Sequence, residues 1–390
     1  MRGWLRQTAG GLPAGFWYLW TGTLVNRLGS FVLIFLAIYL TRVRGFSTSY
    51  AGLVLGLYGA GGAIGTLTGG VLADRWGRRR TLLLSYLSGA GCMVTLGLLR
   101  DRYAIALGAA LLGCASELAR PAFSAFVVDL VPERDRLRAF TLNYWAINLG
   151  FSCAAVLAGL AASVHYSVLF AVDAGTTLVT AGIVLTRVRE PRRPVRATAG
   201  VRPDGLGTVF RDRVFLAFVG LNLLLALIFM QHLSMLPVAM GHDGLTPATY
   251  GLVIALNGVL IVLGQLFVPR LIGHHDRARV LALAALVTGL GFGLTTFTHT
   301  APLYALTVLI WTLGEMLNSP STATTLATLS PAALRGRYQG VFSLSWSGAS
   351  FAAPVLGGLV QQHLGWPALW LGGAAIGAVT AAGHLLSGPA

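Results

Sequence analysis

Five ionisable residues fall inside long apolar segments of this chain, where a charge is unfavourable unless it has a partner or a function. They are Arg27, Glu117, Arg120, Asp173 and Glu315. In hydrocarbon, such a side chain by default marks the path of a proton, an ion or a substrate. The sequence shows no nucleophile motif, metal-ligand spacing or phosphate-binding loop, so these five residues are the first candidates for chemistry.

Glu315 is the strongest candidate, because its neighbours on a helix would be polar or aromatic. Trp311, Asn318 or Ser319, and Thr322 share one helical face with it by their spacing. A carboxyl group on such a face can carry a proton in one state and hold a cationic substrate in the other. The alternative is a structural hydrogen bond to a neighbouring helix.

The other four ionisable residues each allow two interpretations. Glu117 and Arg120 are three residues apart, so they can meet on one helix and neutralise each other. Alternatively, Arg120 pairs elsewhere and leaves Glu117 to bind protons or substrate. Arg27 can either reach across a cavity or orient neighbouring helices. Asp173 lies near a segment end, which favours a structural role.

The segments that carry these residues are long enough to cross a membrane. Of the 390 residues, 55% are hydrophobic and only 11% are charged, a balance outside that of soluble domains. Helices of roughly 20 apolar residues span about 30 Å of hydrocarbon and satisfy their own backbone. The sequence therefore predicts an all-α polytopic membrane protein with twelve transmembrane helices. Their expected ranges are 14–41, 50–73, 80–99, 103–130, 139–163, 167–186, 214–240, 247–270, 278–297, 301–330, 338–362 and 366–386.

The net charge of +15 indicates membrane topology rather than nucleic-acid binding. On the twelve-helix map, 22 arginines fall on one side and four on the other. Arginine collects in cytoplasmic loops, so both termini are expected in the cytoplasm. The polar, Arg- and Pro-rich stretch 191–212 is expected to link two six-helix halves, 1–190 and 213–390.

An internal repeat supports this division. A shift of 199 residues places Gly65 on Gly264 and Pro121 on Pro320. One constant offset across several segment pairs predicts two parallel six-helix repeats, related by an axis along the membrane normal. Transporters of this design bind substrate near mid-membrane and move one repeat against the other.

The connection between the second and third segments carries the most specific motif. It reads Gly-Val-Leu-Ala-Asp-Arg-Trp-Gly-Arg-Arg from Gly70 to Arg79. This run resembles the loop signature of the major facilitator superfamily, and the resemblance implies the major facilitator fold. In that family the loop aspartate, an arginine four residues later and an acid ending the fourth helix form an ionic latch. The resemblance thus implies a conformational latch made of Gly70, Asp74, Gly77, Arg78 and Asp129.

A finer resemblance is to the drug–proton antiporters of that superfamily, the bacterial multidrug exporters. It rests on segments 26–29, 142–149 and 313–338. The antiporter signature of the fifth helix is incomplete, because Ala154-Ala155 stands where the family has Gly-Pro. The corresponding repeat position keeps the proline as Ala353-Pro354.

Together these features predict a monomeric, multi-pass exporter of amphipathic, cationic or neutral small molecules in the inner (plasma) membrane. Glu315 and Glu117 are expected to couple transport to protons, with no cofactor, metal, nucleic-acid partner or enzymatic activity. The expected substrate-binding residues are Arg27, Asn26, Arg120, Tyr144, Trp145, Asn148, Gln231, His232, Trp311 and Asn318. One alternative is a transporter of a specific anionic or zwitterionic metabolite bound by Arg27 and Arg120. Another is a non-transporting membrane sensor.

Overall fold

The computed structural model describes residues 11–164, 166–190, 206–265, 267–272, 275–331 and 334–387. Within these ranges all regular secondary structure is helical, which confirms the all-α prediction for this part of the chain. In this described part of the chain, ten segments are long and apolar enough to cross a membrane, against the twelve expected. Most of the expected linker, 191–205, lies outside the described residues.

The fold divides into two compact units, which separate near the middle of the chain except for one N-terminal segment that belongs to the second unit. Unit 1 comprises Met1–Phe35 and Leu57–Pro194, and unit 2 comprises Leu36–Gly56 and Val195–Ala390. The segment Leu36–Gly56 therefore packs with the C-terminal half. It contains the π-helix η1 (Tyr39–Val43) and the first turns of α4.

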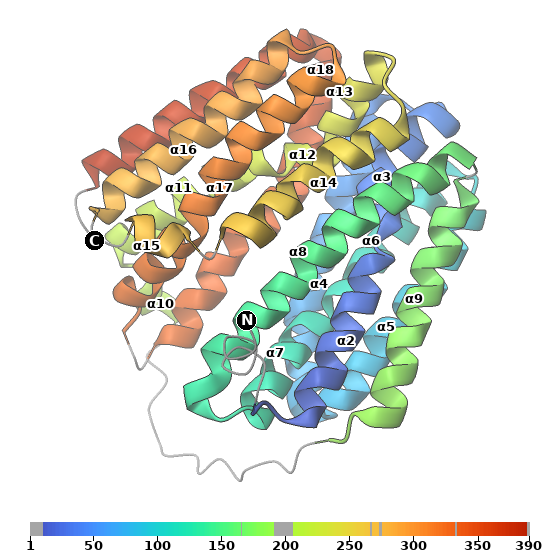
Figure 1. Ribbon diagram of the computed structural model, residues 1–390, viewed down its shortest axis with the longest axis vertical. Coiled ribbons are helices and arrows are strands. Elements are labelled where there is room, and N and C mark those ends of the chain that lie inside the picture. Colours follow the sequence, from blue (N-terminus) through green and yellow to red (C-terminus); the bar gives the residue numbers. More distant parts are fainter. Residues whose placement is uncertain are drawn as a thin grey trace. The chain divides into compact units, whose positions relative to one another are not determined.

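Unit 1 is a bundle of long helices joined by short connections (Figure 1). Its helices are α2 (Ala14–Leu28), most of α3 (Phe31–Ile38), most of α4 (Thr48–Arg75), α5 (Arg78–Leu98), α6 (Arg102–Glu117), α7 (Ala119–Leu130), α8 (Glu133–Val164) and α9 (Ser167–Arg187). In this bundle α5 packs against α6 and α9, and α2 packs against α8 and α9.

Glycines bring α4 and α6 into backbone contact. A Cβ on Gly65 would overlap the carbonyl oxygen of Cys114, and one on Gly69 would lie 2.5 Å from that of Leu118. Small residues permit this approach, which is typical of helix pairs in membranes.

Unit 2 is a second helical bundle in which the last three long helices lie side by side (Figure 1). Besides η1 and the start of α4, its helices are α10 (Leu206–Val209), α11 (Arg213–Phe229), α12 (Gln231–Ser234), α13 (Leu236–His242), α14 (Pro247–Gly264), α15 (Val268–Ile272), α16 (Arg277–Leu294), η2 (Thr295–Phe297), α17 (Ala301–Leu329) and α18 (Arg335–Leu386). Helix α16 packs against α17 and α18, α11 against α18, and α14 against α17. The start of α4 joins this unit through Gly56, where a Cβ would lie 2.6 Å from Val355 of α18.

Helix α18 contains two helices that meet at Gly365, whose φ of 84° belongs to the left-handed region that favours glycine, between the expected ranges 338–362 and 366–386. The expected fourth and seventh spans are locally irregular. Leu118 stands between α6 and α7, and Met230 and Met235 separate α11, α12 and α13, although all three residues keep right-handed helical dihedral angles. These irregular points lie close to Glu117 and His232, two of the predicted site residues.

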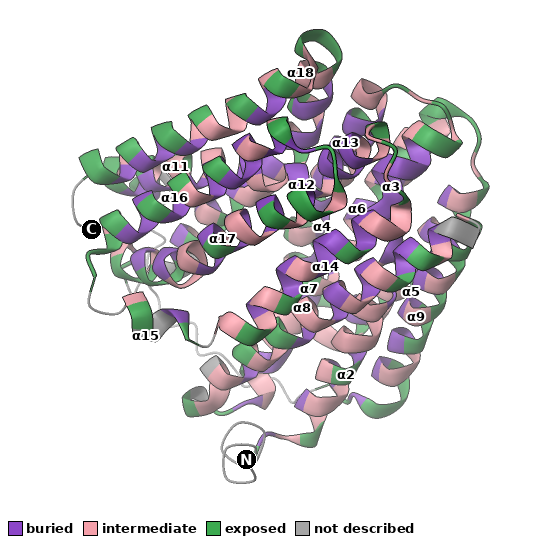
Figure 2. Ribbon diagram, turned by 45° about the horizontal axis from the view of Figure 1, so that its top comes forward, coloured by how far each residue is buried: buried purple, intermediate pink, exposed green. Residues whose placement is uncertain are grey.

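One outward face of helix α16 in unit 2 is apolar. Figure 2 shows exposed and buried residues alternating along α16 and α18. The large exposed residues of α16 include Leu283, Leu286 and Leu290. Their spacing of three and four residues marks one helical face, so this face is suited to contact hydrocarbon.

Candidate functional site

Glu315 is held by a neutral amide from a neighbouring helix. Its Oε2 accepts a hydrogen bond of 2.7 Å from Nδ2 of Asn257 on α14. The same amide nitrogen donates to Oγ1 of Thr312, almost one turn earlier on α17, at 3.1 Å. Asn257 is buried and Glu315 is half-buried. Within the described part of the chain Glu315 makes no ion pair, so it can gain or lose a proton without breaking one.

An aromatic cluster lies one helical turn from Glu315. Trp311 stacks on Phe292 with ring centroids 5.4 Å apart, and it meets Phe229 and His232 at 5.7 Å each. Phe229 in turn contacts Trp346 at 6.0 Å. Trp311 is fully buried. The indole therefore fills the interior of unit 2, next to the carboxyl-bearing face of α17.

Gln231 and His232, the predicted polar residues of the seventh span, hold its middle part, α12, against neighbouring parts of unit 2. Nε2 of Gln231 donates to the carbonyl of Ala353 at 2.9 Å, which ties α12 to α18. Nδ1 of His232 lies 2.6 Å from the Phe229 carbonyl, and the Tyr250 hydroxyl donates to the His232 carbonyl at 3.0 Å. Both side chains are buried. Their present contacts position α12 within unit 2.

Asn318 lies on α17 between Glu315 and the end of the helix. Its Oδ1 accepts a hydrogen bond of 3.1 Å from Oγ1 of Thr322, one turn later. Glu315, Asn318 and Thr322 therefore form a polar stripe, as their spacing predicts.

Glu117 and Arg120 pair with each other. The Arg120 Nε lies 2.7 Å from Glu117 Oε2, and Nη2 donates to Oε1 at 3.1 Å. The Glu117 side chain is 23% exposed and that of Arg120 is 67% exposed. The pair spans Leu118, the residue that stands between α6 and α7. Of the two interpretations of the sequence, mutual neutralisation describes this structure.

Arg27 and Asn26 differ in their partners. Nδ2 of Asn26 donates to Oγ1 of Thr177 at 3.0 Å, which joins α2 to α9. Arg27 is half-buried and has no hydrogen-bond or ion-pair partner among the residues that the structure describes. Helix α8 approaches it closely, because a Cβ on Gly150 would lie 2.5 Å from the Arg27 Cβ. The substrate-binding role expected of Arg27 stays a prediction.

Asp173 has a structural partner. Its buried Oδ2 accepts a hydrogen bond of 3.0 Å from the backbone N–H of Val32, in the first turn of α3. A carboxylate at this position satisfies a free donor at a helix start. The structural role expected for Asp173 fits this contact.

Three predicted substrate-binding residues lie within two turns of α8. Tyr144 and Trp145 are both exposed, and Nδ2 of Asn148 donates to the Tyr144 carbonyl at 2.9 Å. The structure thus brings two aromatic surfaces and one amide together on unit 1.

The expected latch is formed in part, at the end of unit 1 where α4 meets α5. Arg78 Nε lies 2.8 Å from Asp129 Oδ2, with side chains 15% and 11% exposed. Asp74 is exposed and lies outside this pair. Gly77 precedes α5 with a φ of 106°, and Gly70 lies over Pro121, where a Cβ would be 4.0 Å from the ring. The ion pair therefore joins the α4–α5 connection to the end of α7.

Glu190 completes this end of unit 1, although sequence reasoning did not identify it. Its two carboxylate oxygens accept the backbone N–H groups of Arg78 at 2.7 Å and Arg79 at 2.8 Å. The Arg79 guanidinium donates to the carbonyls of Val184 and Leu185 near the end of α9, at 3.3 and 2.5 Å. The first turn of α5 contains no acid of its own. That absence was the available signal that a carboxylate from elsewhere would be favourable at this helix start.

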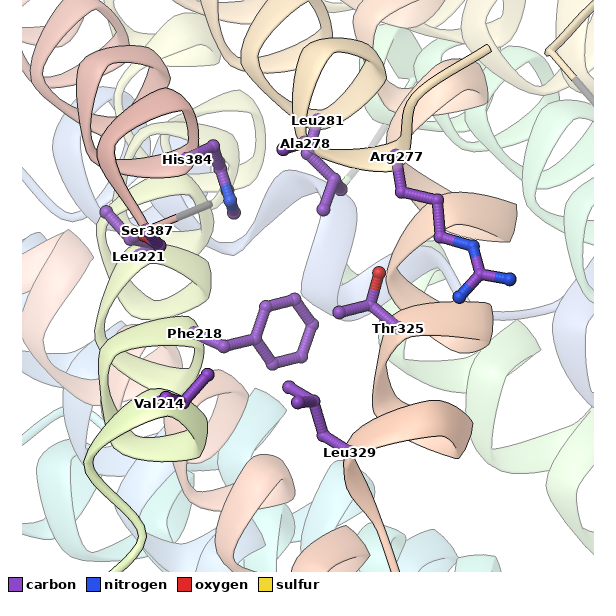
Figure 3. A pocket seen from close by; sticks show the side chains of 10 residues that line it. All are labelled: Val214, Phe218, Leu221, Arg277, Ala278, Leu281, Thr325, Leu329, His384 and Ser387. Carbon is purple, nitrogen blue, oxygen red and sulfur yellow. The ribbon is translucent and has the colours of Figure 1, made fainter. Parts of the chain in front are cut away.

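A small cavity of about 30 Å³ in unit 2 is separate from the predicted site (Figure 3). Its apolar wall comes largely from α11, and its polar groups include Arg277, Thr325 and His384. None of the predicted site residues lines it. It lies at the end of the unit where α16 begins, several turns along α17 from Glu315.

The sequence also matches known proteins. The family model of the Major Facilitator Superfamily matches residues 19–354 and 233–389. The uncharacterized MFS-type transporter YqjV of Bacillus subtilis (strain 168) is 28% identical over 358 residues, which are 90% of this chain and 87% of that protein. The Na(+), Li(+), K(+)/H(+) antiporter of Planococcus maritimus is 24% identical over 88% of this chain and 89% of its own. The multidrug resistance protein MdtH of Cronobacter sakazakii is 26% identical over 86% and 84%.

Solved structures of transporters share the architecture at low sequence identity. The nucleoside transporter NupG matches with a TM-score of 0.81 and 16% identity, over 96% of this chain and 99% of that one. A POT family transporter in complex with 5-aminolevulinic acid matches with a TM-score of 0.82 and 16% identity, over 97% and 96%. At such identities the likeness concerns the fold alone.

Proposed function

Because this chain belongs to the major facilitator superfamily, we propose that it is a secondary transporter that exports amphipathic, cationic or neutral small molecules in exchange for protons. The observation that carries the proposal is the 2.7 Å hydrogen bond between Asn257 and Glu315. It leaves a half-buried carboxyl group within a helical span facing a neutral partner. Such a group can bind a proton and a cationic substrate in turn, so the proton is the coupling ion and no cofactor is needed.

The proposal includes twelve membrane spans with both termini in the cytoplasm of a plasma-membrane protein. The tenth candidate span, Arg337–Leu386, contains two helices that meet at Gly365, and each is long enough to cross. Helix α17 has 29 residues, or about 43 Å at the rise of an α-helix. These two additions raise ten candidates to twelve. The arginine bias gives the orientation.

Alternating access then requires that Glu315 bind its ligands differently in the two states. A proton or a substrate can shift the conformational equilibrium only through its differential affinity for them. We infer that Glu315 takes up a proton from the outer side, when substrate leaves, and releases it towards the cytoplasm. Relatives named as a multidrug resistance protein and a cation/proton antiporter support this direction and coupling.

Other residues assist this carboxyl group in the proposal. Phe229 and Trp346, both half-buried, supply aromatic surface close to it, which favours an amphipathic or cationic ligand. Glu117 is a second proton site that becomes available only when Arg120 releases it. The protein acts as a monomer in the lipid bilayer.

A second candidate function rests on Arg27. This half-buried cation has no partner among the described residues, and a guanidinium binds carboxylate or phosphate well. Arg27 would then bind a specific anionic or zwitterionic metabolite. Arg120 contributes less to this candidate than the sequence suggested, because it is already paired with Glu117.

The test is transport by purified protein in liposomes that contain a pH-sensitive dye. We expect a cationic dye to drive proton movement with the parent protein and about tenfold less with Glu315→Gln. Glu117→Gln tests the second proton site, and its effect should be smaller because Arg120 already neutralises that carboxyl group. Dye transport by Glu315→Gln with an unchanged pH dependence would remove Glu315 from the mechanism. Loss of transport of an anionic metabolite only in Arg27→Ala would favour the second candidate, and ligand binding without any transport would favour a sensor.

A further inference from the structure

Asp243 is the centre of a group of titratable side chains at one end of unit 2. It directly follows α13, and its side chain is largely buried. Oδ2 accepts a hydrogen bond of 2.8 Å from the Tyr304 hydroxyl and lies 3.3 Å from Nδ1 of His299. Oδ1 lies 3.5 Å from Nδ1 of His242. We call these four residues the Asp243 cluster. They connect the end of α13 to the turn before α17 and to the first turn of α17.

Other elements packed near the cluster contribute one further charge in the described part of the chain. Arg42 of η1 donates from Nη1 to the Leu245 carbonyl at 3.4 Å, and a Cβ on Gly241 would lie 2.9 Å from its Nε. From α18, Trp366 approaches the His242 ring with centroids 6.1 Å apart and adds no charge. The cluster therefore contains one carboxylate and two imidazoles, with a guanidinium beside it.

The arrangement suits protons better than a metal ion. The two imidazoles approach opposite oxygens of the carboxylate, so the three groups do not converge on one point. No group of three potential metal ligands occurs among the described residues. The histidine side chains are 67% and 75% exposed, so they equilibrate with the surrounding water.

We propose that the Asp243 cluster is a proton-binding site on the outer side of the protein, which fastens α13 to α17 more firmly in acid. Imidazole changes charge between about pH 5 and pH 8. A protonated imidazole at His299 places a cation beside the carboxylate and strengthens the contact that joins the end of α13 to the turn before α17. His242 adjoins Asp243 at the end of α13, so it adds charge to the cluster without joining the two helices. The added attraction exists only while an imidazole is charged, so the fastening is firmer in acid and weaker at higher pH. Tyr304 holds Asp243 at either pH.

The fastening matters because α13, of seven residues, is the last part of its span. Met230 and Met235 keep right-handed helical dihedral angles, so α11, α12 and α13 follow one another with only local irregularities. The cluster attaches the C-terminal end of α13 to the helix that carries Glu315, eleven residues after Tyr304. This inference rests on the proposed function for its orientation and for the role of Glu315. It adds that outer pH sets how firmly α13 is attached to the helix that bears the coupling carboxyl.

The test measures the distance between nitroxide labels on cysteines introduced at Leu245, after α13, and Leu303, on α17. The native Cys92, Cys114 and Cys153 are first replaced, and the protein is reconstituted in liposomes. We expect one short, narrow distance distribution near pH 5 and a longer or broader one near pH 8, the limits of imidazole titration. The double variant His242→Gln/His299→Gln should give the same distribution at both values. Asp243→Asn, which keeps an acceptor for Tyr304, should also lose the pH response.

His363→Gln provides the matched control, because His363 is an exposed histidine of α18 that is not in the cluster. It should retain the full pH response. A response that persists in the double variant, or is absent from the parent, would overturn the proposal. The same measurement on Glu315→Gln separates it from the proposed function. If Glu315→Gln abolishes the response, the response belongs to Glu315 and the cluster proposal fails. If transport is independent of Glu315 but the response persists, only the proposed function fails.

Discussion

Arg78 lies 2.8 Å from Asp129 in unit 1, and the residues 199 positions later, Arg277 and Thr328, are joined by a hydrogen bond of 2.9 Å in unit 2. In both units the arginine opens a helix, α5 or α16, and its partner lies near the end of another, α7 or α17. The internal repeat is thus preserved as a contact. The two units differ in charge, because unit 1 uses a carboxylate where unit 2 uses a hydroxyl.

This difference predicts unequal costs when the partner of each arginine is removed. Asp129→Thr leaves the guanidinium of Arg78, whose side chain is only 15% exposed, without a countercharge. We expect a loss of about 1–3 kcal/mol, since a charged group loses its partner while remaining largely buried. Thermal unfolding of the protein in detergent measures it.

Thr328→Val is the control, because it removes a neutral partner from an exposed arginine. It should cost about 1 kcal/mol or less. Equal losses for the two variants would show that the carboxylate adds nothing to the contact in unit 1.

Glu190 is predicted to stabilise the start of α5 through both of its oxygens. Glu190→Ala removes acceptors from the N–H groups of Arg78 and Arg79. Loss of a cap costs about 1 kcal/mol, and the helix dipole adds to this when the cap is anionic. Hydrogen exchange of the first turn of α5 should therefore become faster.

Asp101 offers a matched control for this prediction. Its carboxylate caps α6 by accepting from the backbone N–H groups of Tyr103 and Ala104, both at 2.9 Å. Asp101→Ala should accelerate exchange at the start of α6 and leave α5 unchanged. The role of Glu190 as a cap is rejected if Glu190→Ala leaves exchange in α5 as it was.

The sequence could predict contacts between residues that are close together along the chain. Glu117 and Arg120 meet because side chains three residues apart lie on the same face of a helix. Leu118, between them, keeps helical dihedral angles. Long apolar runs likewise predicted helices, since hydrocarbon leaves few other ways to satisfy a backbone. The pairing of Arg78 with Asp129 came from a family resemblance, which carries tertiary information that spacing does not.

The contacts that the sequence could not predict are those that depend on which helices pack together. Asn257 and Glu315 are 58 residues apart, and no local pattern shows that α14 presents an amide to α17. The helical-face argument grouped Trp311 with Glu315, but it could not show that Phe292 would cover the indole. Glu190 lies 112 residues from Arg78, so no local pattern could show that its carboxylate would reach the start of α5.

The close approach of α4 and α6 predicts that Gly65 tolerates no larger residue. A side chain there would overlap the Cys114 carbonyl, which belongs to a helix backbone and cannot rotate away. Gly65→Val should therefore destabilise the protein by about 1–3 kcal/mol or more, the range for overpacking. Thermal unfolding in detergent measures the change. Gly91→Ala, where no atom lies within 4 Å of the new Cβ, should have little effect, and an equal loss there would contradict the packing argument.

The last prediction concerns the amide that holds Glu315. Asn257→Leu removes the donor to Oε2 while keeping a side chain of similar length in a buried position. A hydrogen bond to a charged group contributes about 1.5–3 kcal/mol, which corresponds to roughly tenfold or more in an equilibrium constant. We expect the affinity for a cationic dye at fixed pH to fall about tenfold, because the amide stabilises the ionised carboxyl group. Equilibrium binding to the purified protein measures this change.

Thr312→Val distinguishes the hydrogen bond that Asn257 donates to Glu315 from the hydrogen bond that holds the Asn257 side chain in place. Thr312 accepts the second hydrogen bond of Asn257 at 3.1 Å, so the variant removes that anchor and leaves the donor to Glu315 in place. Dye affinity should therefore stay within about twofold of the parent, well below the tenfold change that a charged hydrogen bond predicts. If both variants lower the affinity equally, the decisive factor is the packing of α14 against α17. If neither variant lowers the affinity, the ionised form of Glu315 that Asn257 stabilises does not bind the cation.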